Sequence, residues 1–456
     1  MALQPAQPLS PPINSSAAWA EHARKVEHIA RQLRQRTSTR PLSLRKRGPS
    51  HQVPKGGDLK YTDDKVDVAA LDAILEIDPD RRVCVAESGV TFVALVAATL
   101  PFGLVPIIVP ELKTITIGGA VSGCSIESMS FVHGGFHDTC RAYEVITARG
   151  DVLQCTPDNE HRLVFQMMQG AFGTLGILSL LTFALVPAKP FVRLRYAKHR
   201  DLEGYLSAIT GHARERDVDF MDGIIHAADN HVLATGDFVD EAPYTSRYDW
   251  MQVYYRSTAT RSEDYLRTPD YFFRYDRGVT NVRPSSFLGR LLFGRWVSST
   301  EVLWLAEKLN WALPRKNPTV TLDVFLPLSK VPAFFDWYRQ TFDFFPLWCV
   351  PYRRVRDYEW LAPSFYEAMG SDEMFVDLAL YGMKQRDGRN LHRLMEEGLI
   401  AHGGIKTLIS HNYYSEAEFW TIWNKPNYDR VKALTDPDNV FRDLYTKTCR
   451  AARGLT

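Results

Sequence analysis

One stretch of the chain has residue types and spacing suited to holding an anion. Pro110–Glu127 reads PELKTITIGGAVSGCSIE, in which Gly118, Gly119 and Gly123 follow a strand-like ITI. Glycines let backbone N–H groups turn toward an anion and let the backbone approach it closely, so a diphosphate can be held without side-chain charge. The alternative is a glycine-rich turn between two buried strands, and the pattern alone does not decide between them.

The common nucleotide and metal motifs are missing from the sequence. It has no GxGxxG after a strand, no GxxxxGK[ST] and no HExxH. Its six cysteines form neither a CxxC pair nor a zinc spacing, so we expect no structural metal. The Pro/Ser-rich residues 1–16 lack the charged and apolar regions of a secretory signal, which favours a cytoplasmic protein with free thiols.

Composition narrows the class of protein further. The 456 residues are 45% hydrophobic and carry 54 basic against 53 acidic side chains, which excludes a disordered chain, a collagen and a histone-like polycation and does not favour a nucleic-acid partner. Charge is uneven locally, because residues 22–48 hold nine basic residues and one acid, Glu27. Three interpretations of this block remain open. It is a solvated helix face, it binds a phosphate-bearing cofactor near residues 40–51, or residues 17–47 contact an anionic membrane surface.

Hydrophobic patterning predicts the elements that must position these residues. Residues 17–37 form an amphipathic helix with an apolar face that includes Val26 and Leu33. Residues 88–110 and 163–188 carry no charge and are long enough to span a membrane. Prolines and glycines interrupt both, so we expect a buried helix, turn and strand in each. Residues 143–157 predict a hairpin that turns at Gly150, and a second unit of strand, helix, strand and strand starts at residue 191.

Several segments occur in a telling order within about 140 residues. They are RKRGPSH (45–51), the run from Val85 to Ser128, the Gly-Gly pair at 134 and 135, YEVITARGDVLQCTP (143–157) and GAFGTLGIL (170–178). Together they resemble the FAD-binding domain of the vanillyl-alcohol-oxidase and para-cresol-methylhydroxylase (PCMH) superfamily. The resemblance implies an α+β fold: a PCMH-type FAD-binding domain of two subdomains, followed by an α+β substrate (cap) domain with an antiparallel sheet.

The same resemblance implies domain limits and FAD contacts. The domains would be a disordered tail (1–16), the FAD-binding domain (17–190), the cap domain (191–430) and a helical segment (431–456) that returns to the FAD-binding domain. The residues carried over to FAD are those of the first loop, the TIGG loop, the flavin-side segment and the GTLG turn: Gly48, Pro49, Ser50 and His51; Thr116, Gly118, Gly119, Ser122 and Gly123; Glu127 and Ser128; Thr174 and Gly176. Many family members bind flavin covalently through a histidine in a Gly-Gly-His loop. Because His51 is not in that frame, we expect non-covalent FAD, and His51 as an ordinary polar loop residue is the alternative.

A narrower resemblance covers most of the chain. TLPFGLVPIIVPELKTITIGGAVSGCSIESMSF, LQCTPDNEHRLVF, VPAKPFVRLRY, PLWCVPYRR and MFVDLALYG are similar to the Δ24-sterol reductases and to bacterial reductases of methylene-fatty-acyl chains. QVYYRS (252–257) and DYFFRYDRG (270–278) look closer to the bacterial acyl-chain relatives. This implies hydride transfer from reduced FAD to a lipid C=C bond with protonation of the other carbon, and NADPH as the electron donor.

Candidates for the proton transfer lie in the second half of the chain. They are Tyr255, Arg256, Tyr381, His411 and Tyr413, all in aromatic segments. For the tyrosines and the histidine, packing in the core with satisfied polar atoms is the alternative. Two other functions remain open: a flavin oxidase or dehydrogenase acting on an alcohol or lipid, and a non-catalytic lipid- or membrane-binding protein. The oligomeric state is not indicated.

Overall fold

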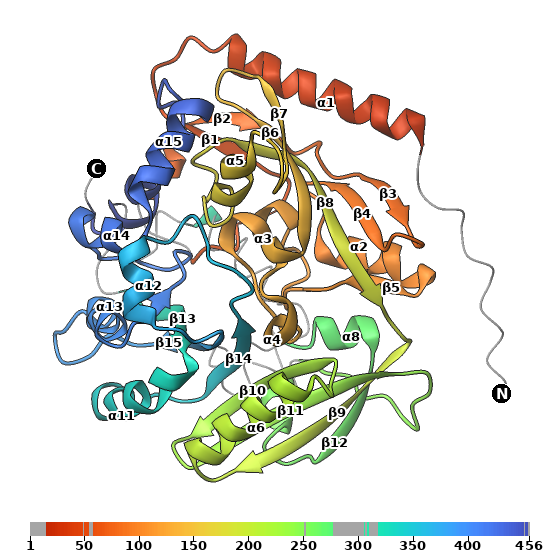
Figure 1. The fold of residues 1–456 in the computed structure, drawn as a ribbon, viewed down its shortest axis with the longest axis vertical. Coiled ribbons are helices and arrows are strands. Elements are labelled where there is room, and N and C mark those ends of the chain that lie inside the picture. The colour runs from red at the N-terminus through yellow and green to blue at the C-terminus, as the bar shows by residue number, and fades with distance from the viewer. Residues whose placement is uncertain are drawn as a thin grey trace.

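The computed structural model describes residues 15–48, 50–53, 58–249, 252–276, 305, 308–309, 318–450 and 452–454. Pro49, most of the predicted tail and the aromatic-rich segment 277–304 lie outside the described residues. The described part contains helices and two large antiparallel sheets (Figure 1). This confirms the α+β class.

The predicted N-terminal helix is confirmed as α1 (Ser16–Arg34), which lies along one side of the N-terminal half (Figure 1). Its apolar face, including Val26, Ile29 and Leu33, is buried in a small core that Leu42 and Val66 also enter. Those two residues belong to β1 (Leu42–Arg45) and β2 (Asp64–Asp67), which pair in parallel. The protein itself therefore covers most of the apolar face that could have met a membrane, whereas Trp19 on the same face is 36% exposed.

The first large sheet has the strand order β3 (Ile74–Asp78), β4 (Val83–Glu87), β8 (Ile177–Pro187), β6 (Cys140–Ile146) and β7 (Val152–Cys155), and β5 (Leu104–Pro106) also pairs with β8. β6 and β7 form the predicted hairpin. The accompanying helices are α2 (Phe92–Thr99), α3 (Ile117–Gly123), α4 (Ser130–His133) and α5 (Arg162–Met167). The two uncharged runs thus become α2 with β5 and α5 with β8, as predicted. Among the described residues, no helix has the length and apolar character needed to cross a membrane.

The second sheet has eight antiparallel strands. Their order is β12 (Glu263–Arg267), β9 (Phe191–His199), β11 (Asn230–Val239), β10 (Phe220–Ala227), β14 (Leu347–Arg353), β15 (Met374–Met383), β13 (Val320–Pro327) and β16 (Ile405–Lys406). With α6 (Leu202–Glu215) between β9 and β10, the predicted strand, helix, strand, strand unit is confirmed. The other helices of this half are α7 (Tyr254–Ser257), α8 (Thr268–Phe272), α11 (Val331–Thr341), α12 (Pro363–Met369) and α13 (Leu391–Ala401).

The two faces of the eight-stranded sheet pack into different cores. Leu322 and Val324 of β13 point to the face that α6, α11 and α13 cover. On β14, Cys349 belongs to this same core. Its neighbours Trp348 and Val350 point to the other face of the sheet and belong to a large core that also contains residues of the N-terminal half. We call this second side the inner face of the sheet. Because side chains alternate along a strand, every second residue of β13, β14 and β15 points toward the N-terminal half.

The C-terminal segment packs on the N-terminal half. It contains α14 (Glu416–Ile422), α15 (Lys425–Thr435) and a short π-helical turn at Thr446–Arg450, and α15 lies beside α5 (Figure 1). Lys432 Nζ donates to the Thr174 carbonyl at 2.9 Å, and Leu42 N donates to the Val440 carbonyl at 2.8 Å. The domain limits at residues 190 and 430 stay predictions.

Candidate functional site

The TIGG loop ends in a helix cap. Thr116 is the N-cap of α3, and its side chain accepts a hydrogen bond from Gly119 N at 3.2 Å. Gly118 packs on Ser88, where a Cβ would lie 2.7 Å from the Ser88 Cβ, whereas a Cβ on Gly123 would meet nothing within 4 Å. Gly118 is thus needed for helix packing, and Gly123 faces open space.

The first loop and the GTLG turn both lie against the TIGG loop. His51 Nε2 is 3.0 Å from Thr114 Oγ1, and burial together with the charge of Lys46 lowers the pKa of His51 to about 4, so the imidazole is neutral. On the other side, Phe172 N donates to the Ser122 carbonyl at 3.3 Å. The structure therefore brings together three of the segments that were carried over to FAD.

A lysine from the C-terminal segment completes this arrangement. Lys447 Nζ lies 3.7 Å from the position of a Cβ on Gly173, in the turn after α5. Among the described residues, no carboxylate is within ion-pair distance of it, and burial lowers its pKa to about 8. A cation beside glycine turns suits a diphosphate, so these residues fit FAD: the loop backbones and Lys447 would hold the diphosphate.

Glu127 and Ser128 connect the two halves of the molecule. Glu127 Oε1 is 3.1 Å from Arg274 Nη2, which also meets Asp222 Oδ2 at 2.8 Å. Ser128 Oγ accepts from the Tyr271 hydroxyl at 2.8 Å. All these side chains are buried. The segment predicted to run beside the flavin therefore also ties the N-terminal half to the inner face of the eight-stranded sheet.

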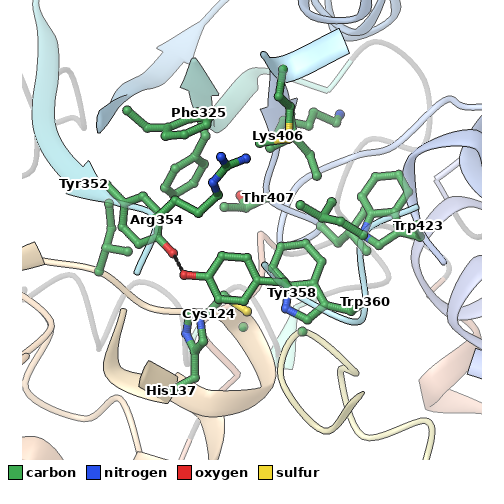
Figure 2. Close-up of a pocket in the computed structure, with 18 of the residues that line it drawn as sticks. Cys124, His137, Phe325, Tyr352, Arg354, Tyr358, Trp360, Lys406, Thr407 and Trp423 are labelled. Carbon is green, nitrogen blue, oxygen red and sulfur yellow. Dashed lines mark hydrogen bonds between the residues drawn. The ribbon is translucent and has the colours of Figure 1, made fainter. Parts of the chain in front are cut away.

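Between the two halves lies a cavity (Figure 2). Gly123, Cys124 and His137 line it from the N-terminal half, while residues 354–369, which follow β14, and residues 405–408 around β16 supply most of the remaining wall. That wall is largely aromatic and aliphatic: Phe325, Tyr352, Tyr358, Trp360, Leu361, Met369, Phe375, Leu408 and Trp423. Such a surface suits an apolar ligand.

Some of the polar side chains that line this cavity are hydrogen-bonded or ion-paired. The Tyr352 and Tyr358 hydroxyls are hydrogen-bonded to each other (Figure 2). Tyr358 also donates to Asp138 Oδ2 at 2.9 Å, and Asp138 is ion-paired to Arg356 at 2.8 Å. Lys406 is paired with Glu396 at 2.7 Å. These contacts orient Tyr352 and Tyr358 in the aromatic wall, whereas both ring nitrogens of His137 and Trp360 Nε1 have no hydrogen-bond partner among the described residues.

The predicted catalytic residues do not form one group. Tyr255 is buried in α7 and accepts from Arg256 Nε at 3.1 Å, and Arg256 itself is exposed. His411 is buried beside His392, whose ring centre lies 5.3 Å away, and Tyr413 N donates to Glu396. Their catalytic roles stay predictions.

Tyr381 is placed differently from these four residues. It lies on the inner face of β15 and donates to Asp323 Oδ1 at 2.8 Å. It thus joins a group of buried acids.

Sequence reasoning missed the acids of this group, Asp323 and Asp377, and it missed the aromatic wall. The acids could have been found from the sequence, because Asp323 and Asp377 are single acids inside the apolar strands TLDVF and FVDLAL. The aromatic wall was harder to predict, because Tyr358, Trp360 and Trp423 lie in irregular segments without a periodic pattern.

Comparison with known proteins agrees with the geometry. Residues 17–156 match the family described as FAD binding domain. Human Δ24-sterol reductase is 26% identical over 419 residues, which cover 87% of this chain and 80% of that protein. The rat Δ24-sterol reductase is 26% identical over 463 residues, covering 96% of this chain and 88% of that protein. A decaprenylphosphoryl-β-D-ribose oxidase of Mycolicibacterium smegmatis is 32% identical over 125 residues, 27% of each chain.

The match to an FAD-binding domain covers the first loop, the TIGG loop and the hairpin. The sterol reductases extend the similarity across the eight-stranded sheet and the C-terminal segment. The chain is therefore an FAD-dependent oxidoreductase whose residues 17–156 match an FAD-binding domain of the PCMH type.

Proposed function

We propose that this protein reduces a C=C bond of a lipid, either in a sterol side chain or in a methylene-branched fatty acyl chain. The observation that carries the proposal is the apolar, aromatic cavity between the FAD-binding residues and the inner face of the eight-stranded sheet. An isolated alkene offers no charge to grip, so it must be held by apolar contact. The similarity to Δ24-sterol reductases supports the same chemistry.

The residues have separate tasks in this reaction. Bound FAD, reduced by NADPH, would supply the hydride. The first loop, the TIGG loop and Lys447 hold the diphosphate, and the aromatic wall holds the lipid and excludes water. Because Tyr352 and Tyr358 are tied to Asp138, the wall keeps its shape when the cavity is empty.

The test is an anaerobic half-reaction. The purified holoprotein is reduced with NADPH, and the flavin absorbance is followed after adding a sterol with a side-chain double bond or a methylene-branched acyl lipid. Return of the oxidised spectrum with one lipid and not the other supports the reductase and identifies its substrate class. The saturated form of each lipid serves as the control and is expected to leave the flavin reduced.

An oxidase is the second candidate, because the 125-residue match is to a protein named as an oxidase. In that case the reduced flavin would reoxidise in air and ignore both alkenes. Oxygen consumption with a lipid alcohol would then support the second candidate over the first.

A further inference from the structure

The wall of the cavity contains two cations and no acid. Arg354 and Lys406 both line it, whereas no aspartate or glutamate among the described residues does. The rest of the wall is largely aromatic and aliphatic, and such a surface screens charges poorly. A cation in this wall therefore attracts a negatively charged group on any ligand that enters.

The fold neutralises Lys406. Its Nζ is 2.7 Å from Glu396 Oε1, with both side chains fully buried, and it also donates to the His411 carbonyl at 2.6 Å. Arg354 differs, because no carboxylate in the described part of the chain is within ion-pair distance of its guanidinium and no described residue accepts a hydrogen bond from its side chain. Within that part of the chain, the charge of Arg354 is left to a ligand or to solvent.

The two arginines nearest to Arg354 in the sequence are paired. Arg353 Nη1 is 2.9 Å from Glu373 Oε2, and Arg356 Nη2 is 2.8 Å from Asp138 Oδ1. Arg353 also donates to two backbone carbonyls. Neither Arg353 nor Arg356 lines the cavity. The arginine whose charge is left uncompensated is thus also the one that reaches the cavity.

Strand pairing explains why Arg354 and not Arg353 reaches the cavity. Arg354 N donates to the Glu373 carbonyl at 2.7 Å, which extends the ladder between β14 and β15 by one residue. Side chains alternate along such a ladder. Arg354 therefore shares the inner face of the sheet with Tyr352, which lines the cavity, while Arg353 points to the opposite face.

Aromatic rings flank the guanidinium of Arg354. Its central carbon lies 5.3 Å from the centre of the Tyr366 ring and 5.9 Å from that of Phe375, within the range of a cation–π contact. Phe375 also lines the cavity, and Figure 2 shows Arg354 among the side chains that surround it. The side chain of Arg354 is half-buried. Aromatic faces do not accept the in-plane N–H groups of a guanidinium, so these donors stay available to an anion.

This arrangement matches one class of lipid better than the other. A fatty acyl lipid carries its charge at one end, as a carboxylate or a phosphate, and a planar guanidinium binds either group with two parallel hydrogen bonds. A half-buried cation also lets such a headgroup keep part of its hydration while the apolar chain is enclosed. The polar group of a sterol is a neutral hydroxyl, which gains no charge pairing from an arginine.

We propose that Arg354 binds the anionic headgroup of the substrate, so that the lipid reduced is a fatty acyl lipid with a carboxylate or phosphate and not a sterol. The inference rests on the proposed function, which it narrows to one of the two lipids. Gly123 and Cys124 line the cavity from the FAD-binding half, whereas Arg354 follows a strand of the eight-stranded sheet. A headgroup at Arg354 therefore directs the chain, with its double bond, toward the residues assigned to FAD.

Binding without turnover tests the role of the charge. The oxidised holoprotein is titrated with dodecanoate, dodecyl phosphate and methyl dodecanoate, which have similar chains and differ in the charge of the head. Quenching of tryptophan fluorescence reports binding, because Trp360 and Trp423 line the cavity. We expect both anions to bind at least about tenfold more tightly than the ester, the gain from a charge-assisted hydrogen bond. The tighter of the two anions identifies the headgroup as a carboxylate or as a phosphate.

The decisive variant is Arg354→Met, which keeps an unbranched side chain and removes the charge. Its dissociation constants for both anions should rise about 10- to 100-fold, while that for the ester should change little. Arg354→Lys keeps the charge and should retain part of the preference. Arg353→Met, on the opposite face of the sheet, is the matched control and should bind all three compounds like the wild type.

Three results of these titrations would overturn the inference. They are a wild type that binds the ester as tightly as the anions, a wild type that binds none of the three compounds, and a preference for anions that persists in Arg354→Met. The flavin content of Arg354→Met is measured by absorbance and should equal that of the wild type. Loss of FAD from this variant would assign the arginine to the cofactor and would also overturn the inference.

Reoxidation of the reduced flavin separates this inference from the proposed function. With a methylene-branched fatty acid, Arg354→Met should raise the concentration that gives half the maximal rate about 10- to 100-fold and leave the maximal rate nearly unchanged, as expected for lost ground-state binding. The methyl ester of that acid should react alike with the variant and the wild type. A wild type that is reoxidised by the sterol and not by the acyl lipid would overturn the inference and leave the proposed function standing. A wild type that no alkene reoxidises would overturn the proposed function and this inference with it.

Discussion

A buried histidine that bridges two glutamates holds α1 on the first sheet. His22 Nδ1 lies 2.9 Å from Glu87 Oε1, and His22 Nε2 lies 3.0 Å from Glu144 Oε1. Burial alone would lower the pKa of His22, but the hydrogen bonds and charges of the two glutamates outweigh it and raise the value to about 9. His22 is therefore protonated in the folded protein at neutral pH.

The size of the effect follows from the two pKa values. The difference between about 9 and the ordinary 6.5 corresponds to about 3 kcal/mol. Because the folded-state pKa is the higher one, this stability is present below pH 6.5 and is lost as pH rises through about 9. Glutamine keeps one hydrogen-bond donor and no charge, as neutral histidine does. His22→Gln should therefore cost about 3 kcal/mol near pH 6.5 and almost nothing at pH 9.5.

The assay is a thermal melt of the wild type and His22→Gln across this pH range. For a chain of this length, about 3 kcal/mol corresponds to a fall of about 3 °C in Tm. The gap should close as pH rises from 6.5 to 9.5. An equal loss of Tm at both ends of the range would refute the reasoning, because it would mean that the variant acts through shape and not through the charge of His22.

Three further outcomes can be measured on purified variants. Arg274→Met would leave two carboxylates buried without a cation and should cost about 3–5 kcal/mol by urea unfolding; a loss below about 1 kcal/mol would contradict the buried ion pairs. Gly118→Ala would press a methyl against Ser88 and should lower stability by about 1–3 kcal/mol, whereas Gly123→Ala should leave stability within about 0.5 kcal/mol. Equal melting points for the two would show that Gly118 is not tightly packed. Lys447→Met should weaken FAD binding about tenfold by fluorescence titration, the loss of a charge-assisted contact, and unchanged affinity would remove this lysine from the FAD site.

Local patterns predicted the elements well, because their causes are local. The helix α1 follows from the spacing of Val26, Ile29 and Leu33, and all three are buried in it. The two uncharged runs were divided correctly because proline and glycine end helices wherever the chain goes. The hairpin β6–β7 turns at the predicted Gly150.

The basic residues between positions 22 and 48 show that ion pairs with distant residues cannot be predicted from a local count of charges. Residues 22–48 alone have a large excess of positive charge. The pairing of β2 with β1, however, places the acids of β2, which lie outside these residues, beside the basic side chains. Arg45 pairs with Asp67, and Arg47 pairs with Asp72. The excess that suggested an anionic partner is thus partly neutralised within the fold.

The acid group depends on a strand order that no short pattern contains. Asp323 and Asp377 lie on the same face of the sheet because β13 and β15 are neighbours in it. Each is a lone acid among apolar residues. That pattern indicates a buried acid but does not tell which acids meet.

The most direct test of the central claim is product analysis after a single anaerobic turnover in heavy water. The reduced holoprotein is mixed with the lipid alkene that reoxidises it, and the lipid is examined by mass spectrometry. Hydride and proton both exchange with solvent before transfer, so the account predicts a saturated lipid that carries one deuterium on each carbon of the former double bond. An unchanged alkene, or an oxidised lipid formed only when oxygen is admitted, would contradict it.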